Sequence, residues 1–157
     1  MPREIKFRSK RVDNGEWVYG GSIIRFGDEV TEYYMPQYRE KCRCEHDESD
    51  NIVSFIGGMF YKLDPETVGQ FTGLKGKNGK EIYEGDIVKA WSQGICGKFK
   101  VIWRREGSPC WILYPAWRNG RFWYLHGTLH KDGYWYDNVE VIGNIYDNPE
   151  LLQEAAK

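Results

Sequence analysis

The sequence predicts a mainly β fold. Apolar residues alternate with a period of two in several segments, and Asn-Gly or Asp-Gly turn signals stand between those segments. Aromatic residues, which favour strands and interfaces, make up 16% of the 157 residues. With 41% hydrophobic and 29% charged residues, the composition is that of an ordinary folded domain.

The clearest alternation lies in four segments, Ile5–Arg8, Glu16–Gly21, Lys98–Trp103 and Val139–Tyr146. The turn signals are Asp13-Asn14-Gly15, Gly57-Gly58, Lys77-Asn78-Gly79, Arg118-Asn119-Gly120 and Lys131-Asp132-Gly133. Asn-Gly and Asp-Gly supply the positive φ angles of hairpin turns, so we expect at least four hairpins.

Two short helical pieces are predicted. In Asp64-Pro65-Glu66-Thr67 a capping residue precedes a proline at the first helical position, and Gly69 ends the helix after one turn. Asn148-Pro149-Glu150 repeats this arrangement. We expect a short C-terminal helix there, with Leu151 and Leu152 packed on the sheet.

The segment Glu81–Arg105 looks like the first hairpin of an SH3-like or related small β-barrel. In such a barrel Asp86 begins a strand, and Ile87 and its alternate neighbours enter the core. The remaining strands would come from Trp103, Trp111–Leu113, Phe122–Leu125 and Val139–Ile145.

We expect a single domain over residues 1–157, because the chain is too short for two ordinary domains. Within it, residues 1–62 form a β-rich N-terminal part, and residues 67–157 form the barrel-like core with the C-terminal helix. Residues 36–50 contain almost no large apolar side chains, so we expect a mobile surface loop there.

Charge and the start of the chain bear on location. The formal net charge of −1 argues against attraction of the whole surface to nucleic acid or to a membrane. The basic start has no apolar run behind it, so we expect no signal peptide, no membrane partner and a cytoplasmic location. In a reducing cytoplasm we expect free thiols at the four cysteines, Cys42, Cys44, Cys96 and Cys110.

Cys42, Cys44 and His46 could supply metal ligands within the sequence CRCEH. Zinc sites normally combine two ligand clusters, and the second cluster is missing because Cys96 and Cys110 stand apart. We therefore expect an ordinary exposed loop and no metal or other cofactor, with a zinc site as the alternative.

His126 and His130 could form a metal-binding or proton-transfer pair, since residues four apart on a strand lie on the same side. The sequence contains no phosphate-binding loop, no G-x-S-x-G and no H-E-x-x-H. We favour a structural role for the two histidines and expect that the protein is not an enzyme. A small metal-dependent hydrolase is the weakest alternative.

Basic and aromatic residues gather between Lys89 and Arg121. Seven basic residues stand there against the single acid Glu106, which gives 7 − 1 = +6. Cations for phosphates combined with aromatic planes for bases are typical of single-stranded nucleic-acid binding. The candidate contacts are Lys98, Lys100, Arg104, Arg105, Trp117, Arg118 and Arg121.

Alternation along Lys98–Arg104 allows another interpretation, in which the cations mark the solvent face and the aromatics enter the core or a subunit interface. A stacking surface would need aromatics on the same side as the cations. Trp117 is the aromatic residue that we expect to be most exposed.

Three segments carry a family resemblance: DPETVGQFTGLKGKNGKEIYEGDIV at Asp64–Val88, VEVIGNIYDNPELL at Val139–Leu152, and the opening MPREIKFRSK. Together they resemble the YopX family, which is found mostly in phages and prophages of Gram-positive bacteria and has no assigned activity. The resemblance implies a phage- or prophage-encoded accessory protein in the host cytoplasm, acting as a non-enzymatic binding or assembly module. It also implies self-association as a homo-oligomer, for which the many Trp and Tyr residues are suited, with a phage or host protein as a possible partner.

The residues that carry the signature are Gly69, Gln70, Thr72, Gly73, Asn78, Gly79, Tyr83, Gly85, Asp86, Gly143 and Asn144. We expect most of them to be structural, with the glycines and Asn78 in turns and with Thr72 and Asp86 bonded to nearby backbone amides. If this set contains a functional polar surface, Gln70, Tyr83 and Asp86 are the candidates.

Overall fold

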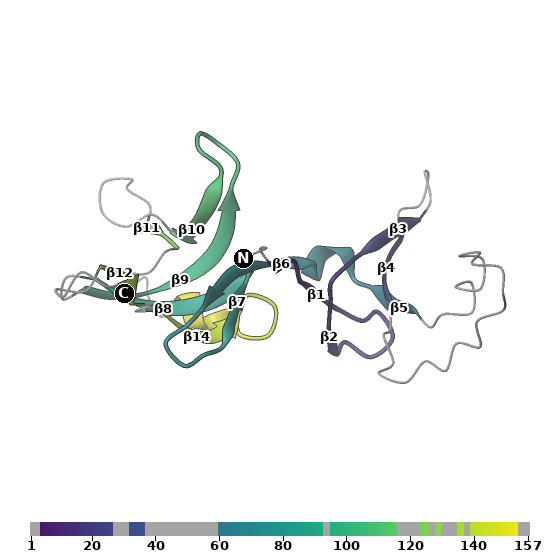
Figure 1. Cartoon of the computed structure of the whole chain (residues 1–157). Coiled ribbons are helices and arrows are strands. Elements are labelled where there is room, and N and C mark those ends of the chain that lie inside the picture. Colours follow the sequence, from purple (N-terminus) through teal and green to yellow (C-terminus); the bar gives the residue numbers. More distant parts are fainter. Residues whose placement is uncertain are drawn as a thin grey trace. The chain divides into compact units, whose positions relative to one another are not determined.

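The structure is a computed structural model, and it describes residues 4–26, 32–36, 60–92, 95–115, 123–125, 128–129, 135–136 and 139–153. The chain divides into two compact units (Figure 1). Residues 6–68 form the N-terminal unit, and residues 1–5 with 69–157 form the C-terminal unit. The predicted mainly β fold with a short C-terminal helix is confirmed. That residues 1–157 behave as one domain stays a prediction.

The N-terminal unit is built from short antiparallel strands. β1 (Phe7–Lys10) pairs with β2 (Trp17–Gly20). β4 (Glu32–Pro36) pairs with β3 (Ile24–Phe26) on one side and β5 (Phe60–Leu63) on the other. Met35 and Leu63 are its large buried apolar side chains among the described residues. The first strand begins two residues later than the alternation predicted.

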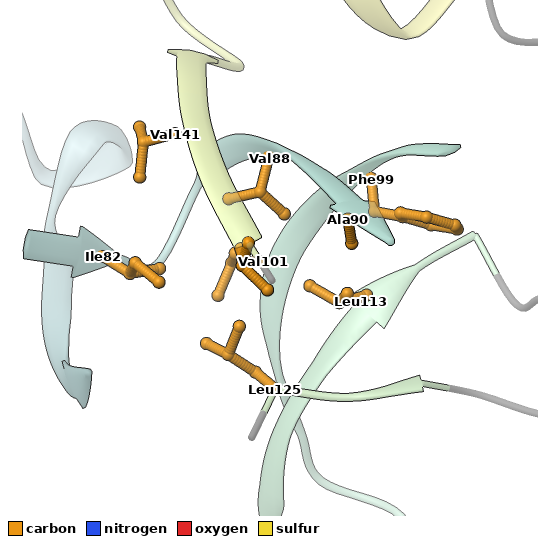
Figure 2. Close-up of a cluster of buried hydrophobic side chains, with 9 residues drawn as sticks. Ile82, Val88, Ala90, Phe99, Val101, Leu113, Leu125 and Val141 are labelled. Atoms are coloured by element: carbon orange, nitrogen blue, oxygen red, sulfur yellow. The ribbon is translucent and has the colours of Figure 1, made fainter. Parts of the chain in front are cut away.

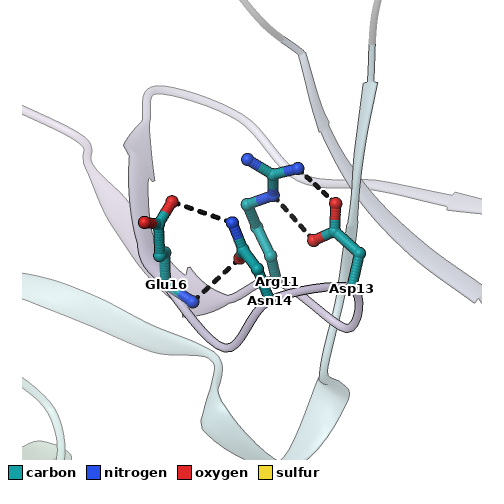
Figure 3. A network of polar contacts seen from close by, with 4 residues as sticks. All are labelled: Arg11, Asp13, Asn14 and Glu16. Carbon is teal, nitrogen blue, oxygen red and sulfur yellow. Dashed lines mark hydrogen bonds and ion pairs between the residues drawn. The ribbon is translucent and has the colours of Figure 1, made fainter.

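The turn between β1 and β2 is the predicted Asp13-Asn14-Gly15 turn, and Gly15 has the positive φ of 72° that such a turn requires. Figure 3 shows its polar network, in which the Arg11 guanidinium bonds both carboxylate oxygens of Asp13. Asn14 donates to Glu16 Oε2 at 2.8 Å and accepts from Glu16 N at 3.0 Å. The hydrogen bond from Arg11 lowers the pKa of Asp13.

The predicted single helical turn is the 3-10 helix η2 (Pro65–Thr67). The carboxylate of Asp64 caps it by accepting from Glu66 N at 3.1 Å. Thr67 is buried, and its Oγ1 accepts from Lys10 N at 2.8 Å and lies 3.0 Å from Ser9 Oγ. These bonds attach η2 to β1.

The C-terminal unit begins with a hairpin of β6 (Gly69–Lys75) and β7 (Glu81–Tyr83). A five-stranded antiparallel sheet follows, in the order β11-β10-β9-β8-β14. Its strands are β8 (Asp86–Ser92), β9 (Ile95–Arg104), β10 (Cys110–Tyr114), β11 (Trp123–Tyr124) and β14 (Val139–Asn144). The remaining elements are the paired strands β12 (Thr128–Leu129) and β13 (Trp135–Tyr136) and the helix α1 (Glu150–Gln153).

Two of the five signature glycines, Gly79 and Gly85, lie at turns as expected, whereas the other three lie within strands, Gly69 and Gly73 in β6 and Gly143 in β14. Gly79 closes the predicted Lys77-Asn78-Gly79 turn between β6 and β7 with a φ of 76°. Gly85 has a φ of 83° between β7 and β8, and its N–H donates to Val101 O at 2.9 Å. Its carbonyl accepts from Ile145 N at 2.9 Å. Gly85 therefore links the start of β8 to β9 and to the end of β14.

One apolar cluster forms the core of the C-terminal unit (Figure 2). Its members are Ile82, Val88, Ala90, Phe99, Val101, Leu113, Leu125, Val139 and Val141. Asp86 begins β8 as predicted, but the predicted core register is only partly right. Ile87 is buried, but it lies with its alternate neighbours Lys89 and Trp91 on the face opposite the cluster. Val88 and Ala90 enter the cluster instead.

The five-stranded sheet has open edges among the described residues, where no pairing joins β11 to β14. The predicted closed SH3-like barrel is therefore not confirmed. Within the described ranges no helix is both long enough and apolar enough to cross a membrane.

Candidate functional site

The two faces of the five-stranded sheet differ in chemistry. Successive side chains of a strand point to opposite faces, and residues directly opposite in neighbouring strands share a face. One face carries the apolar cluster, with Val88, Phe99 and Leu113. The register places Lys98 opposite Lys89 and Lys100 opposite Tyr114 on the other face.

We call this second face the cationic face. It is defined by the described residues Lys89, Trp91, Lys98, Lys100, Arg104, Tyr114, Tyr124 and Glu140. The buried side chains of Ile87 and Ile112 lie between them on the same face. Tyr114 is 42% exposed and Tyr124 is 50% exposed. The helix α1 lies against β9, and Leu151 Cδ1 would come within 2.9 Å of a Cβ added at Gly143. Because Gly143 pairs with Ile87 and α1 also contacts β9, the helix covers a part of this face that extends from β14 across β8 to β9.

Positive charge is concentrated on the cationic face. Lys89 and Lys98 stand directly opposite each other on β8 and β9, an arrangement that is unfavourable for like charges. Glu140 of β14 stands opposite Lys89 on the other edge of β8. Its carboxylate forms an ion pair with the Lys77 ammonium at 2.8 Å. Around this single acid the face therefore gathers a surplus of cations, which favours an anionic ligand.

Aromatic rings lie beside these cations. The Lys100 ammonium is 4.9 Å from the centroid of the Tyr114 ring. Trp91 has two lysines over its ring, Lys77 at 4.0 Å and Lys89 at 5.2 Å. The condition for a stacking surface, aromatics on the same side as cations, is therefore met by residues from different strands.

The predicted basic set is only partly brought together. Lys98, Lys100 and Arg104 share the cationic face, and the guanidinium of Arg104 lies against Gly107 in the turn after β9. Arg105 is exposed after the end of β9, where its charge acts on the carboxylate of Glu84. The other three predicted contacts, Trp117, Arg118 and Arg121, lie outside the described residues.

Sequence reasoning did not select Lys89, Trp91, Tyr114 and Tyr124 as site residues. Along β9 the predicted separation is correct, because Phe99 and Val101 enter the core while Lys98 and Lys100 point the other way. To select these residues, one must know which residue of the neighbouring strand stands opposite each aromatic residue. That information is the strand register, and it is not contained in the alternation along a single strand.

The opposite face has its own exposed aromatic residue. Trp103 pairs with Trp111 across β9 and β10, and the two rings form an edge-to-face contact with centroids 4.9 Å apart. Trp111 packs against the core cluster, whereas Trp103 is 38% exposed. Trp103 therefore does not enter the core.

Two of the three polar candidates of the signature are buried. Asp86 is 1% exposed, and its Oδ2 accepts from Tyr83 N at 2.8 Å across the turn between β7 and β8. Tyr83 is 3% exposed, and its ring packs against Phe71 in a tilted contact with centroids 5.4 Å apart. Its hydroxyl donates to Glu81 Oε2 at 2.8 Å. Gln70 is half-buried. Because two of the three side chains are buried, the set forms no exposed polar surface. A buried carboxylate needs hydrogen-bond donors around it, and Tyr83 N is such a donor for Asp86.

Thr72 has the local role expected of it. Its hydroxyl is buried, donates to Ile82 O at 2.8 Å and accepts from Leu74 N at 3.2 Å. Thr72 therefore bridges the β6–β7 hairpin at the point where the strands change register.

Glu84 is a half-buried acid in the turn between β7 and β8. Burial raises its pKa, and hydrogen bonds from the backbone of Gln70 and Trp103, together with the charge of Arg105, act in the opposite direction. Because burial is the largest of these effects, the carboxyl holds its proton more tightly in the folded protein than in the unfolded chain.

The metal candidates are not tested by the structure. Cys42, Cys44, His46, His126 and His130 all lie outside the described residues. Within the part of the chain that is described, no three His, Cys, Asp or Glu side chains are grouped as metal ligands. Cys96 and Cys110 are free thiols, as expected.

The fold and this site describe a mainly β protein with a cationic, aromatic sheet face. The YopX protein family model matches residues 6–153, so the chain belongs to the YopX family. No curated protein matches the chain. A solved structure, protein EF1440 from Enterococcus faecalis, is 22% identical with a TM-score of 0.38, over 94% of this chain and 97% of that one.

Proposed function

We propose that this protein is a phage- or prophage-encoded accessory protein of the host cytoplasm that acts by binding and not by catalysis. We further propose that its cationic face contacts single-stranded nucleic acid. Membership of the YopX family supports the phage setting, because the family is found mostly in phages and prophages.

One observation carries the proposed ligand: Lys98 and Lys100 share a sheet face with the exposed ring of Tyr114. Lysines on such a face neutralise phosphates, and aromatic planes accept bases without reading their sequence. The directly opposed Lys89 and Lys98 add to the argument, because they place two positive charges side by side on this face.

The test is a fluorescence-anisotropy titration of the full chain with a labelled oligothymidylate of about 12 nucleotides at several salt concentrations. We expect binding that weakens as salt rises. In the variant Lys98→Ala/Lys100→Ala, the slope of log K against log salt should fall by about 1.4, which is about 0.7 for each lost phosphate contact.

The matched control is Arg25→Ala/Lys62→Ala, which removes the same charge from two exposed basic residues of β3 and β5 in the N-terminal unit. Its slope should equal that of the unmodified protein. Equal slopes for all three proteins would mean that the cationic face is not the contact. A flat titration at low salt would reject nucleic-acid binding altogether.

Assembly is the second role that we propose, and the exposed ring of Trp103 favours it. Light scattering during size-exclusion chromatography should give a homo-oligomer that dissociates on dilution. Trp103→Ser should weaken the assembly, while Tyr19→Ser, at an exposed tyrosine of β2, should not. A monomer at every concentration would contradict self-association and leave a phage or host protein as the partner to seek.

A further inference from the structure

We infer that Tyr114 and Tyr124 are two base-stacking positions that hold neighbouring, unstacked bases of a single strand, with Lys100 as their phosphate contact. This inference rests on the proposed function, because it specifies how the cationic face would hold a nucleic acid. Its distinctive consequence is a preference for bases over a bare phosphate backbone.

The relative position of the two rings follows from the register. Tyr124 pairs with Ile112 across β10 and β11, and Tyr114 lies two residues beyond Ile112 on the same face. The two tyrosines are therefore diagonal neighbours, and such positions are about 7–8 Å apart in an antiparallel pair. Both side chains are exposed, at 42% and 50%.

That spacing decides between two kinds of nucleic acid. Consecutive bases stacked in a duplex are about 3.4 Å apart along each strand, whereas the two tyrosines extend from backbone positions about 7–8 Å apart. They suit bases that are splayed apart, as in single strands bound on sheet surfaces. Duplex should therefore bind no better than its backbone charge requires.

Lys100 is placed to join this pair. It stands directly opposite Tyr114, and its ammonium is 4.9 Å from the ring centroid. An exposed cation–ring contact is weaker than the stacking of a base on the same ring, so a base can take the ring while the ammonium turns to the adjoining phosphate. Trp91 differs, because Lys77 and Lys89 both lie over its ring and Lys77 is held by Glu140.

The experiment compares three labelled probes of about 12 nucleotides on the full chain: oligothymidylate, an abasic strand with the same number of phosphates, and a duplex. We expect the unmodified protein to bind oligothymidylate at least about 5-fold more tightly than the abasic strand, the lower limit for a single stacked base. Tyr114→Leu and Tyr124→Leu should each reduce that ratio, whereas Tyr114→Phe and Tyr124→Phe should keep it, because phenylalanine retains the ring.

Tyr19→Leu is the matched control, since Tyr19 is 58% exposed on β2 in the other unit and should leave the ratio unchanged. Equal binding of thymidylate and abasic probes by the unmodified protein would overturn the inference while leaving nucleic-acid binding in place. An unchanged ratio in both leucine variants, or preference for duplex, would also overturn it. No binding of any probe would reject the proposed function itself. The comparison of probes on the unmodified protein needs no variant, so a variant that does not fold cannot hide the answer.

Discussion

Replacing Asp86 by alanine should destabilise the C-terminal unit strongly, although it removes a single polar side chain. Asp86 is 1% exposed at the first position of β8, and its Oδ2 accepts from Tyr83 N at 2.8 Å. The bond closes the turn between β7 and β8, where Gly85 also contacts Val101 and Ile145 through its backbone.

The size of the effect follows from the chemistry of that bond. A hydrogen bond to a charged group contributes about 1.5–3 kcal/mol, and a buried donor left without a partner costs about 1–3 kcal/mol. We expect a loss of about 2–3 kcal/mol in the free energy of unfolding for Asp86→Ala. Asp86→Asn keeps an acceptor oxygen and the shape of the side chain, so it should lose about 1 kcal/mol.

Urea unfolding followed by tryptophan fluorescence measures these differences, provided that the dependence on urea is equal among variants. Glu106→Ala is the control, because Glu106 is an exposed acid in the β9–β10 turn of the same unit. If Asp86→Ala unfolds within about 0.5 kcal/mol of the unmodified protein, the structural role argued for Asp86 is refuted. Loss of oligonucleotide binding at unchanged stability would instead assign Asp86 to the site.

Three further substitutions test the same unit by urea unfolding. Gly85→Ala should lose about 1–2 kcal/mol, because the φ of 83° is unfavourable for alanine and the added Cβ would lie 3.2 Å from Tyr146. Gly79→Ala has a similar φ but open space around the added Cβ, so it measures the backbone cost without the contact. Val101→Ala should lose about 2 kcal/mol through the cavity that it leaves in the core cluster. An equal loss for Val12→Ala, at an exposed valine of the N-terminal unit, would count against this explanation. Since burial raises the pKa of Glu84, the folded state binds its proton more tightly, and stability should fall as pH rises from the ordinary carboxyl range through that raised pKa. Glu84→Gln should remove this part of the pH dependence, which lies above about pH 4, and an unchanged profile would contradict it.

The local structure could be predicted from the sequence because it depends on neighbours in the chain. Asp64 caps a single turn because a proline and an acid follow it. Gly15 and Gly79 take positive φ angles that other residues adopt at a cost, so the turns could be located without knowing the fold. The bonds of Thr72 and Asp86 to nearby backbone amides belong to the same class of short-range chemistry.

Side-chain alternation was less complete as a guide. It separates the two sides of a strand but does not say which side is covered, as β8 illustrates. Ile87 and Val88 are both fully buried, one on each face, because the apolar cluster covers one face and α1 lies on the other. A strand buried on both faces has no single inward set to read from the sequence.

The chain by itself thus determined the mainly β fold, the turns, the two short helices and the family, all of which depend on local residue order. Only the tertiary structure decided the candidate site. The pairing of β9 with β10 and of β10 with β11 sets Lys100 beside Tyr114 and brings Tyr124 to the same face, while the end of β9 directs Arg105 toward Glu84. The physical reason is that a sheet surface is made across strands, and a shift of one residue in any pairing would exchange its two faces.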